Sequence, residues 1–194
     1  MTHIQNIPHI LQFGITHQDS SNRNLNYIVI GDDSLINHRN RKLLPNGQYL
    51  GDYIPFYFGF RTPMLYVIQK GYNNVSRTHP ENIVYCISNI KTILDLKINF
   101  YFTDGHATAA ISRFYSIEQI YDIQNILDFD SINERDWKKY PDTKRKKEAE
   151  LLLESDLPNT GIIGYAVYNE NAKEQLVKFG VSDNKIVIKP NFYF

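Results

Sequence analysis

The segment from Tyr53 to Phe60, YIPFYFGF, restricts the fold most strongly, because its side chains alternate between two kinds. An isoleucine and three phenylalanines alternate with two tyrosines, a proline and a glycine. This period of two predicts a β-strand with one apolar face and one tyrosine-lined face. Pro55 favours an edge position or a bulge, and Gly59 allows another group to approach the backbone closely. We expect the phenylalanines Phe56, Phe58 and Phe60 in the core.

Helices and strands are expected to alternate irregularly along the rest of the chain. After the strand, Thr62 suits a helix N-cap, Pro63 the first turn and Gly71 the end. Such patterns predict helices within 6–14, 32–44, 62–71, 88–97 (capped by Ser88), 117–129, 143–155 and 170–180, and strands within 26–31, 82–88, 98–105, 160–169 and 184–194. Because no regular βαβ order appears, we predict an α+β fold rather than a doubly wound parallel sheet.

The length of 194 residues fits a single domain spanning 1–194. No apolar run approaches the roughly 18–20 residues that span a bilayer, and no signal peptide is apparent. The single cysteine, Cys86, lies in an apolar strand pattern and is interpreted as a core residue. One cysteine and six histidines make a structural zinc site improbable, and we predict no metal and a reducing, cytoplasmic location.

Three residues are candidates for chemistry, although each also has a simpler interpretation. Glu150 falls in a predicted helix, where its pattern favours the surface, but at a cleft its carboxylate could accept a sugar hydroxyl or a proton. Arg39 fits a solvated helix, yet its guanidinium could also hold a pyrophosphate. His106 follows a strand and could be an ordinary loop histidine. Rossmann, Walker and conventional hydrolase motifs are absent.

A basic run gives the chain a possible nucleic-acid surface despite its formal net charge of zero. Between Arg135 and Lys147 stand seven basic residues, opposed by three nearby acidic ones. Most such runs are solvated helix faces, so the run by itself leaves both interpretations open.

Several segments are informative when taken together: THIQNIPHILQFG, LINHRNRKL, GDYIPFYFGFRTPMLY, FTDGHA, KKEAELLL and the terminal strand region. In their order and spacing they resemble the DarT family of bacterial toxins, which ADP-ribosylate single-stranded DNA using NAD. The resemblance covers nearly the whole chain. It implies an ADP-ribosyltransferase-like fold with two packed β-sheets around an NAD cleft and helices outside.

The resemblance also implies roles for individual residues. Arg39 matches the catalytic arginine and Glu150 the catalytic glutamate. The first motif of the family is usually H-x-T-H, of which Thr2 and His3 match while the leading histidine is absent. The expected NAD contacts are Thr2, His3, Asn6, His9, Arg39, Tyr57 and Met64. The expected DNA contacts are Arg61, His106, Arg113, Lys144, Arg145 and Lys147.

The implied reaction breaks the nicotinamide–ribose bond of NAD through an oxocarbenium-like transition state. Glu150 would orient the ribose and take a proton from the attacking base, which is thymine in the family. Because arginine stays protonated, Arg39 would act electrostatically rather than as a base. A DarG-type macrodomain antitoxin is the expected partner. The alternatives are transfer to RNA or protein, or a catalytically decayed module that binds single strands.

Overall fold

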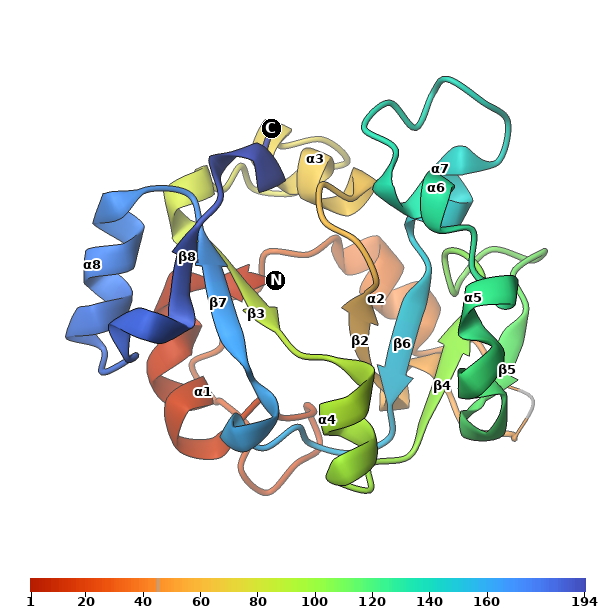
Figure 1. Cartoon of the computed structure of the whole chain (residues 1–194), viewed down its shortest axis with the longest axis horizontal. Coiled ribbons are helices and arrows are strands. Elements are labelled where there is room, and N and C mark those ends of the chain that lie inside the picture. Colours follow the sequence, from red (N-terminus) through yellow and green to blue (C-terminus); the bar gives the residue numbers. More distant parts are fainter. Residues whose placement is uncertain (45) are drawn as a thin grey trace. The chain divides into compact units, whose positions relative to one another are not determined.

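The computed structural model describes residues 1–44 and 46–194, which form two compact units. Unit 1 comprises Met1–Asp32, Val67–Ile98 and Ser155–Phe194, and unit 2 comprises Asp33–Tyr66 and Asn99–Glu154. Each unit is built on its own four-stranded sheet with helices around it (Figure 1). The predicted α+β class is therefore confirmed.

The sheet of unit 1 has the order β1-β3-β7-β8. Its strands β1, β3 and β7 pair antiparallel, whereas β7 and β8 run parallel and are joined through α8, which lies beside them (Figure 1). A parallel pair needs such a crossover connection. The strand bounds are Thr2–His3 for β1, Ile83–Ile87 for β3, Gly164–Val167 for β7 and Ile186–Ile188 for β8.

The helices of unit 1 begin and end largely where the sequence predicts. In α1, Pro8 lies in the first turn and Gly14 ends the helix with φ of +82°, a backbone conformation that favours glycine. The cap of α4 is Asn89, whose side chain accepts from Thr92 N, and not Ser88 as expected. The bounds are Ile7–Phe13 for α1, Ile90–Asp95 for α4 and Glu170–Lys178 for α8, with 3-10 turns at Ile4–Asn6, Pro80–Asn82, Asn159–Gly161, Asp183–Lys185 and Pro190–Phe192.

The sheet of unit 2 is antiparallel throughout, with the order β2-β6-β4-β5. Strand β2 lies at an edge, which suits Pro55 because proline has no N–H for a ladder. Tyr57 on β2 stands directly opposite Glu150 on β6. The bounds are Ile54–Tyr57 for β2, Phe100–Thr103 for β4, Phe114–Ser116 for β5 and Glu150–Leu153 for β6.

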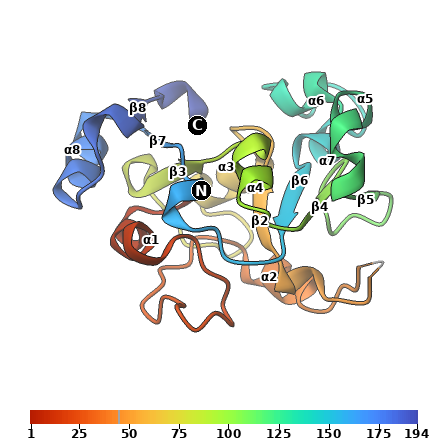
Figure 2. The ribbon, with the colours of Figure 1, turned by 60° about the horizontal axis from the view of Figure 1, so that its bottom comes forward.

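Short helices flank this sheet, and Figure 2 shows α5 and α6 near β4 to β6. Helix α3 spans Pro63–Lys70 and links the two units along the chain; Thr62 caps it by accepting from Leu65 N. The bounds of the others are Asp33–Arg39 for α2, Ile123–Ile126 for α5, Phe129–Asn133 for α6 and Thr143–Lys147 for α7, with 3-10 turns at Leu50–Asp52 and Ile117–Asp122.

The helix predicted for 143–155 is wrong in its second half. Helix α7 ends at Lys147, and β6 begins at Glu150. The residues KKEAELLL are good helix formers, but the three leucines that follow Glu150 are at most 7% exposed in the sheet. A central strand buries both of its faces, so tertiary burial overrides the weak preference of these residues for a helix.

Three further expectations differ from the structure. The apolar segment 26–31 forms no strand. The single helix expected over 117–129 is divided into a 3-10 turn over Ile117–Asp122 and α5, which ends at Ile126 because the chain becomes extended at Leu127. The phenylalanines Phe56, Phe58 and Phe60 are half-buried rather than fully buried. Gly59 does meet a close neighbour, since a Cβ there would lie 2.8 Å from Ile132 Cγ2.

A compact apolar cluster supports one face of the sheet of unit 2. It consists of Leu44, Leu50, Tyr53, Ala107 and Leu152, and Tyr101 and Phe114 pack against it. Leu152 lies two residues after Glu150 on β6, so both side chains share this face. The cluster therefore lies next to the carboxylate expected to do chemistry. No helix of the described residues is long and apolar enough to cross a membrane.

Candidate active site

Arg39 and Glu150 form an ion pair in unit 2, although 111 residues separate them in the sequence. Arg39 Nη1 lies 2.7 Å from Glu150 Oε2, and the two side chains are 15% and 2% exposed. Burying two charges is costly unless they are paired, and removing one partner leaves the other uncompensated. Arg39 Nη2 is also buried and has no hydrogen-bond partner among residues 1–44 and 46–194. The guanidinium thus holds the carboxylate with one nitrogen and retains a second donor.

The start of β6 explains how Glu150 is held. Its backbone N–H donates to Thr103 Oγ1 at 3.1 Å, and that hydroxyl in turn donates to the Gly105 carbonyl at 2.7 Å. The second carboxylate oxygen, Oε1, accepts from the backbone N–H of Ala107 at 2.9 Å. Both oxygens of Glu150 therefore already have donors, and the direction of the carboxylate is defined from two sides.

Tyr57, His106 and Glu148 surround this pair. Burial, together with the charges of Glu150 and Glu148, raises the pKa of Tyr57 well above its usual range. Burial lowers the pKa of His106. The charge of Glu150 raises this pKa, whereas the charges of nearby cations, including Arg39, lower it further. Burial raises the pKa of Glu148 to about 8. The charge of Lys144 opposes this rise, and the charge of Glu150 adds to it. Near Glu150, burial therefore favours the neutral form of each of these three side chains.

The loop that carries His106 and Ala107 is tied to α7. Arg145 pairs with Asp104 at 2.9 Å and with Asp142 at 2.7 Å, and it donates to Ser112 Oγ at 3.1 Å. A Cβ at Gly105 would lie 2.9 Å from Arg145 Cγ, so only glycine fits beneath this arginine. Arg145, expected at the DNA, is thus engaged in ordering this loop.

The other expected DNA contacts differ from one another in exposure. Lys144 and Arg113 are exposed, Arg61 is half-buried, and its backbone is left-handed with φ of +51°. Lys147 is 1% exposed and donates to the Ile132 carbonyl at 2.7 Å, so in this structure its ammonium is not available for the expected contact with DNA. Burial, with Arg61 nearby, lowers the pKa of Lys147 to about 8.

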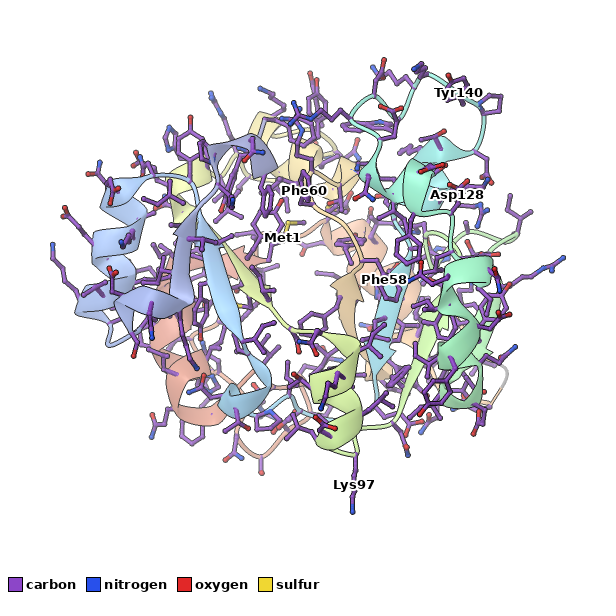
Figure 3. All side chains as sticks on the ribbon, viewed as in Figure 1. Met1, Phe58, Phe60, Lys97, Asp128 and Tyr140 are labelled. Carbon is purple, nitrogen blue, oxygen red and sulfur yellow. The ribbon has the colours of Figure 1, made fainter. Side chains whose placement is uncertain are left out.

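The segment between α6 and α7 carries the rest of the basic run. Tyr140 lies exposed on this segment, with the Lys139 ammonium 5.1 Å from its ring centre (Figure 3). Lys146 is paired with Asp128 at 2.9 Å, at the start of α6. The basic residues of 135–147 are therefore divided between three that are bonded within the protein, Arg145, Lys146 and Lys147, and an exposed group made of Arg135, Lys138, Lys139 and Lys144.

Four expected NAD contacts belong to unit 1. Asn6 Nδ2 donates to Thr2 Oγ1 and to the Ile28 carbonyl, both at 2.9 Å, and Asn6 Oδ1 accepts from Ile28 N at 2.9 Å. Thr2 Oγ1 also lies 3.3 Å from the Tyr27 hydroxyl. This network attaches the segment around Tyr27 to the start of the chain.

The other two expected NAD contacts of unit 1 are the histidines His3 and His9. His3 Nδ1 accepts from Gln5 N at 3.2 Å, and burial lowers the pKa of His3. His9 Nε2 lies 2.8 Å from the Asn22 carbonyl oxygen. Met64, the last of the expected NAD contacts, is the half-buried second residue of α3 in unit 2.

Sequence reasoning missed three residues of this site: Thr103, Ala107 and Lys42. Lys42 Nζ donates to the carbonyls of Ala107 and Ala109 at 2.6 and 3.3 Å. No local sequence pattern predicts such backbone contacts, because they join Lys42 to a loop 65 residues further along the chain. The burial of Glu150 had a signal: the run of three leucines directly after it is typical of a strand covered on both faces. No metal-ligand cluster occurs within the part of the chain that the structure describes.

Comparison with known proteins shows the class of the protein. The solved structure of Thermus sp. 2.9 DarT in complex with ADP-ribosylated ssDNA matches with a TM-score of 0.86 and 28% identity, covering 100% of this chain and 93% of that one. The same protein in complex with NAD+ matches at 0.79 with 27% identity over 100% and 94%. This fold, with a buried arginine–glutamate pair, is that of an ADP-ribosyltransferase.

Sequence relatives show the family. A DNA ADP-ribosyl transferase of Escherichia coli O127:H6 is 33% identical over 185 residues, 91% of this chain and 82% of that protein. A Thermosipho africanus DNA ADP-ribosyl transferase–DNA ADP-ribosyl glycohydrolase fusion protein is 28% identical over 196 residues, covering 100% of this chain and 48% of that one. The family model described as ssDNA thymidine ADP-ribosyltransferase, DarT, matches residues 1–194, and the chain belongs to this family.

Proposed function

We propose that this protein transfers ADP-ribose from NAD to thymine in single-stranded DNA, with Glu150 and Arg39 as its catalytic residues. The observation that carries the proposal is the 2.7 Å contact between the partly buried Arg39 and the buried Glu150 in a member of the DarT family. Bound NAD supplies the ADP-ribosyl group and a nicotinamide that leaves neutral with the electrons of the broken bond.

Glu150 is proposed to act twice. Its negative charge stabilises the positive charge that develops on the ribose as the glycosidic bond breaks. As a ring nitrogen of thymine forms the new bond to the ribose carbon, that nitrogen loses its proton, and the carboxylate accepts it. The two hydrogen bonds from Arg39 and Ala107 keep the carboxylate directed without using all of its lone pairs.

Arg39 is proposed as an orienting and electrostatic residue. Its guanidinium stays protonated, so it does not act as a base. Nη1 holds Glu150, and the buried Nη2, which has no partner in the described part of the chain, supports a role as donor to an oxygen of the dinucleotide. One side chain would thereby link the position of the carboxylate to the position of the co-substrate.

The remaining contacts are proposed from the family motifs together with their surroundings. Thr2, His3, Asn6 and His9 of unit 1, and Tyr57 and Met64 of unit 2, are proposed NAD contacts. Arg61, His106, Arg113 and Lys144 are proposed DNA contacts, which the exposure of Arg113 and Lys144 supports. Arg145 and Lys147 are not among them, since their charged groups are held by neighbouring residues.

A partner and a location complete the proposal. The similarity to a transferase–glycohydrolase fusion supports a macrodomain antitoxin of the DarG type as the partner, which would remove the ADP-ribose. The single cysteine supports the prediction that the protein acts in the reducing cytoplasm. The family model, which matches residues 1–194, supports a single domain over that range.

The test is mass spectrometry of single-stranded oligonucleotides after incubation with the protein and NAD. Thymine-containing strands should gain the mass of one ADP-ribose and release one nicotinamide, and matched strands without thymine should gain nothing. RNA and a protein mixture serve as competing acceptors in the same assay. Modification of RNA or protein instead of DNA would contradict the proposal, as would salt-sensitive strand binding with no nicotinamide release.

A further inference from the structure

The side chains of Lys42 and Glu150 both form hydrogen bonds with the backbone of Ala107. The carbonyl of Ala107 accepts from Lys42 Nζ at 2.6 Å, and the N–H of Ala107 donates to Glu150 Oε1 at 2.9 Å. Lys42 also reaches the Ala109 carbonyl at 3.3 Å, so it holds the loop between β4 and β5 at two points. The position of the N–H on which Glu150 rests therefore depends on this lysine.

These contacts close into a ring. Glu150 Oε2 accepts from Arg39, and the backbone N–H of Lys42 donates to the Arg39 carbonyl at 3.2 Å. The segment at the end of α2 therefore contacts the carboxylate in two ways. Arg39 contacts it directly, and Lys42 acts through the loop, by binding the carbonyl of Ala107. Such a ring fixes both oxygens of Glu150 relative to the same short segment.

The surroundings of Lys42 favour this role over that of an ordinary surface lysine. The side chain is half-buried, and its ammonium lies 5.3 Å from the ring centre of Phe114. No carboxylate of the described residues pairs with it within 4.0 Å. Burial lowers the pKa of Lys42, and the charge of Glu150 opposes this change. A partly desolvated ammonium is costly, which argues that its contacts to the loop carbonyls serve the site.

We propose that Lys42 is a positioning residue, which aims the Glu150 carboxylate by fixing the backbone of Ala107. Ala107 is itself fully buried in the apolar cluster of unit 2, so little movement is needed to misplace its N–H. The inference deepens the proposed function and rests on it for its effect on rate. Its effect on the loop is independent of any activity.

The test compares Lys42→Met, Lys42→Arg and the control Lys178→Met, which makes the same change at an exposed position of α8. With NAD and a thymine-containing oligonucleotide, Lys42→Met should lower kcat by about 10- to 100-fold while KM for NAD changes less than about threefold, because catalytic geometry is lost rather than binding. Lys42→Arg should recover at least part of kcat, and Lys178→Met should match the wild type.

Hydrogen exchange of the segment 104–109 provides the readout that needs no activity. Exchange there should be about tenfold faster in Lys42→Met than in the wild type, and unchanged in Lys178→Met. If Lys42→Met does not fold, Lys42→Gln, which keeps one donor, replaces it. Unchanged exchange overturns the inference, and so does wild-type kcat or a loss confined to KM. If the wild type itself shows no transfer, the proposed function fails while the exchange result still decides the role of Lys42.

Discussion

Two polar groups, one in each unit, are built on different principles. In unit 2, Arg39 and Glu150 are opposite charges joined by one contact, with Glu148 and Lys42 close by. In unit 1, Asn6, Thr2 and Tyr27 are neutral and joined by hydrogen bonds that include the backbone of Ile28. Both groups hold distant segments together, but only the first retains charge away from water.

The difference indicates what each group is for. Neutral buried groups are stabilised once their hydrogen bonds are made, so the network around Asn6 suits the ordering of a binding segment. A buried ion pair is weak as a source of stability, because desolvation offsets the attraction. The charged group of unit 2 is therefore better explained by chemistry than by folding, and the four predictions below test that separation.

The largest effect is expected for Glu150→Gln. It should lower the rate of ADP-ribose transfer by at least about 10²–10³, because the charge that stabilises the transition state is lost. The variant should also melt lower, since Arg39 loses its counter-charge. The double variant Arg39→Met/Glu150→Gln should recover the melting temperature but not the activity. Transfer above a tenth of the wild-type rate in Glu150→Gln would remove Glu150 from the mechanism.

The second prediction concerns Glu148→Gln and the dependence of stability on pH. The pKa of Glu148 is about 8 in the folded protein against 4.5 for an unperturbed group, so the folded state keeps a proton that the unfolded state releases. The contribution of Glu148 to the stability of the wild type should therefore fall as pH rises from about 4.5 to about 8.

Glu148→Gln should flatten this fall and be more stable than the wild type near pH 8. Urea unfolding at several pH values between 5 and 8 measures the effect. Asn6→Ala, which alters the neutral network, should keep the slope of the wild type. Equal slopes in Glu148→Gln and the wild type would show that Glu148 does not titrate in this range.

The third prediction concerns the neutral network. Asn6→Ala should reduce the free energy of unfolding by about 1–3 kcal/mol, because the amide of Ile28 and the hydroxyl of Thr2 lose their partner. Because Asn6 is also a proposed NAD contact, KM for NAD should rise about tenfold while kcat changes little. Asn26→Ala, at an exposed neighbouring position, is the control. A fall in kcat with unchanged KM would contradict the separation between the two groups.

The smallest effect is expected for Lys144→Ser, which removes one exposed charge beside the site. Affinity for single-stranded DNA should weaken slightly, and the slope of log affinity against log salt should fall by about 0.7, as for one lost phosphate contact. Fluorescence anisotropy over a range of salt concentrations measures this slope, with Lys178→Ser as the control. Identical slopes in both variants would place the DNA away from Lys144.

Much of the fold could be predicted from local sequence signals. Pro8 and Gly14 bound α1, Thr62 caps α3, and the alternation around Tyr57 marks an edge strand. These signals act over a few residues, through backbone conformation and the period of the side chains, and need no knowledge of the rest of the chain. The motifs that contain Arg39 and Glu150 likewise stand in the sequence and identified the family, which the comparison confirmed.

Only the tertiary structure decided the setting of those residues. The sequence KKEAELLL predicts a helix, but the sheet of unit 2 buries its leucines in a strand. Lys147 was expected to contact DNA, but its ammonium donates a hydrogen bond to the Ile132 carbonyl. The contact between Arg39 and Glu150 joins segments that are 111 residues apart in the sequence. The hydrogen bond from Lys42 to the Ala107 carbonyl joins segments that are 65 residues apart. Burial and desolvation, which give these charges their properties, arise only when distant parts of the chain exclude water together.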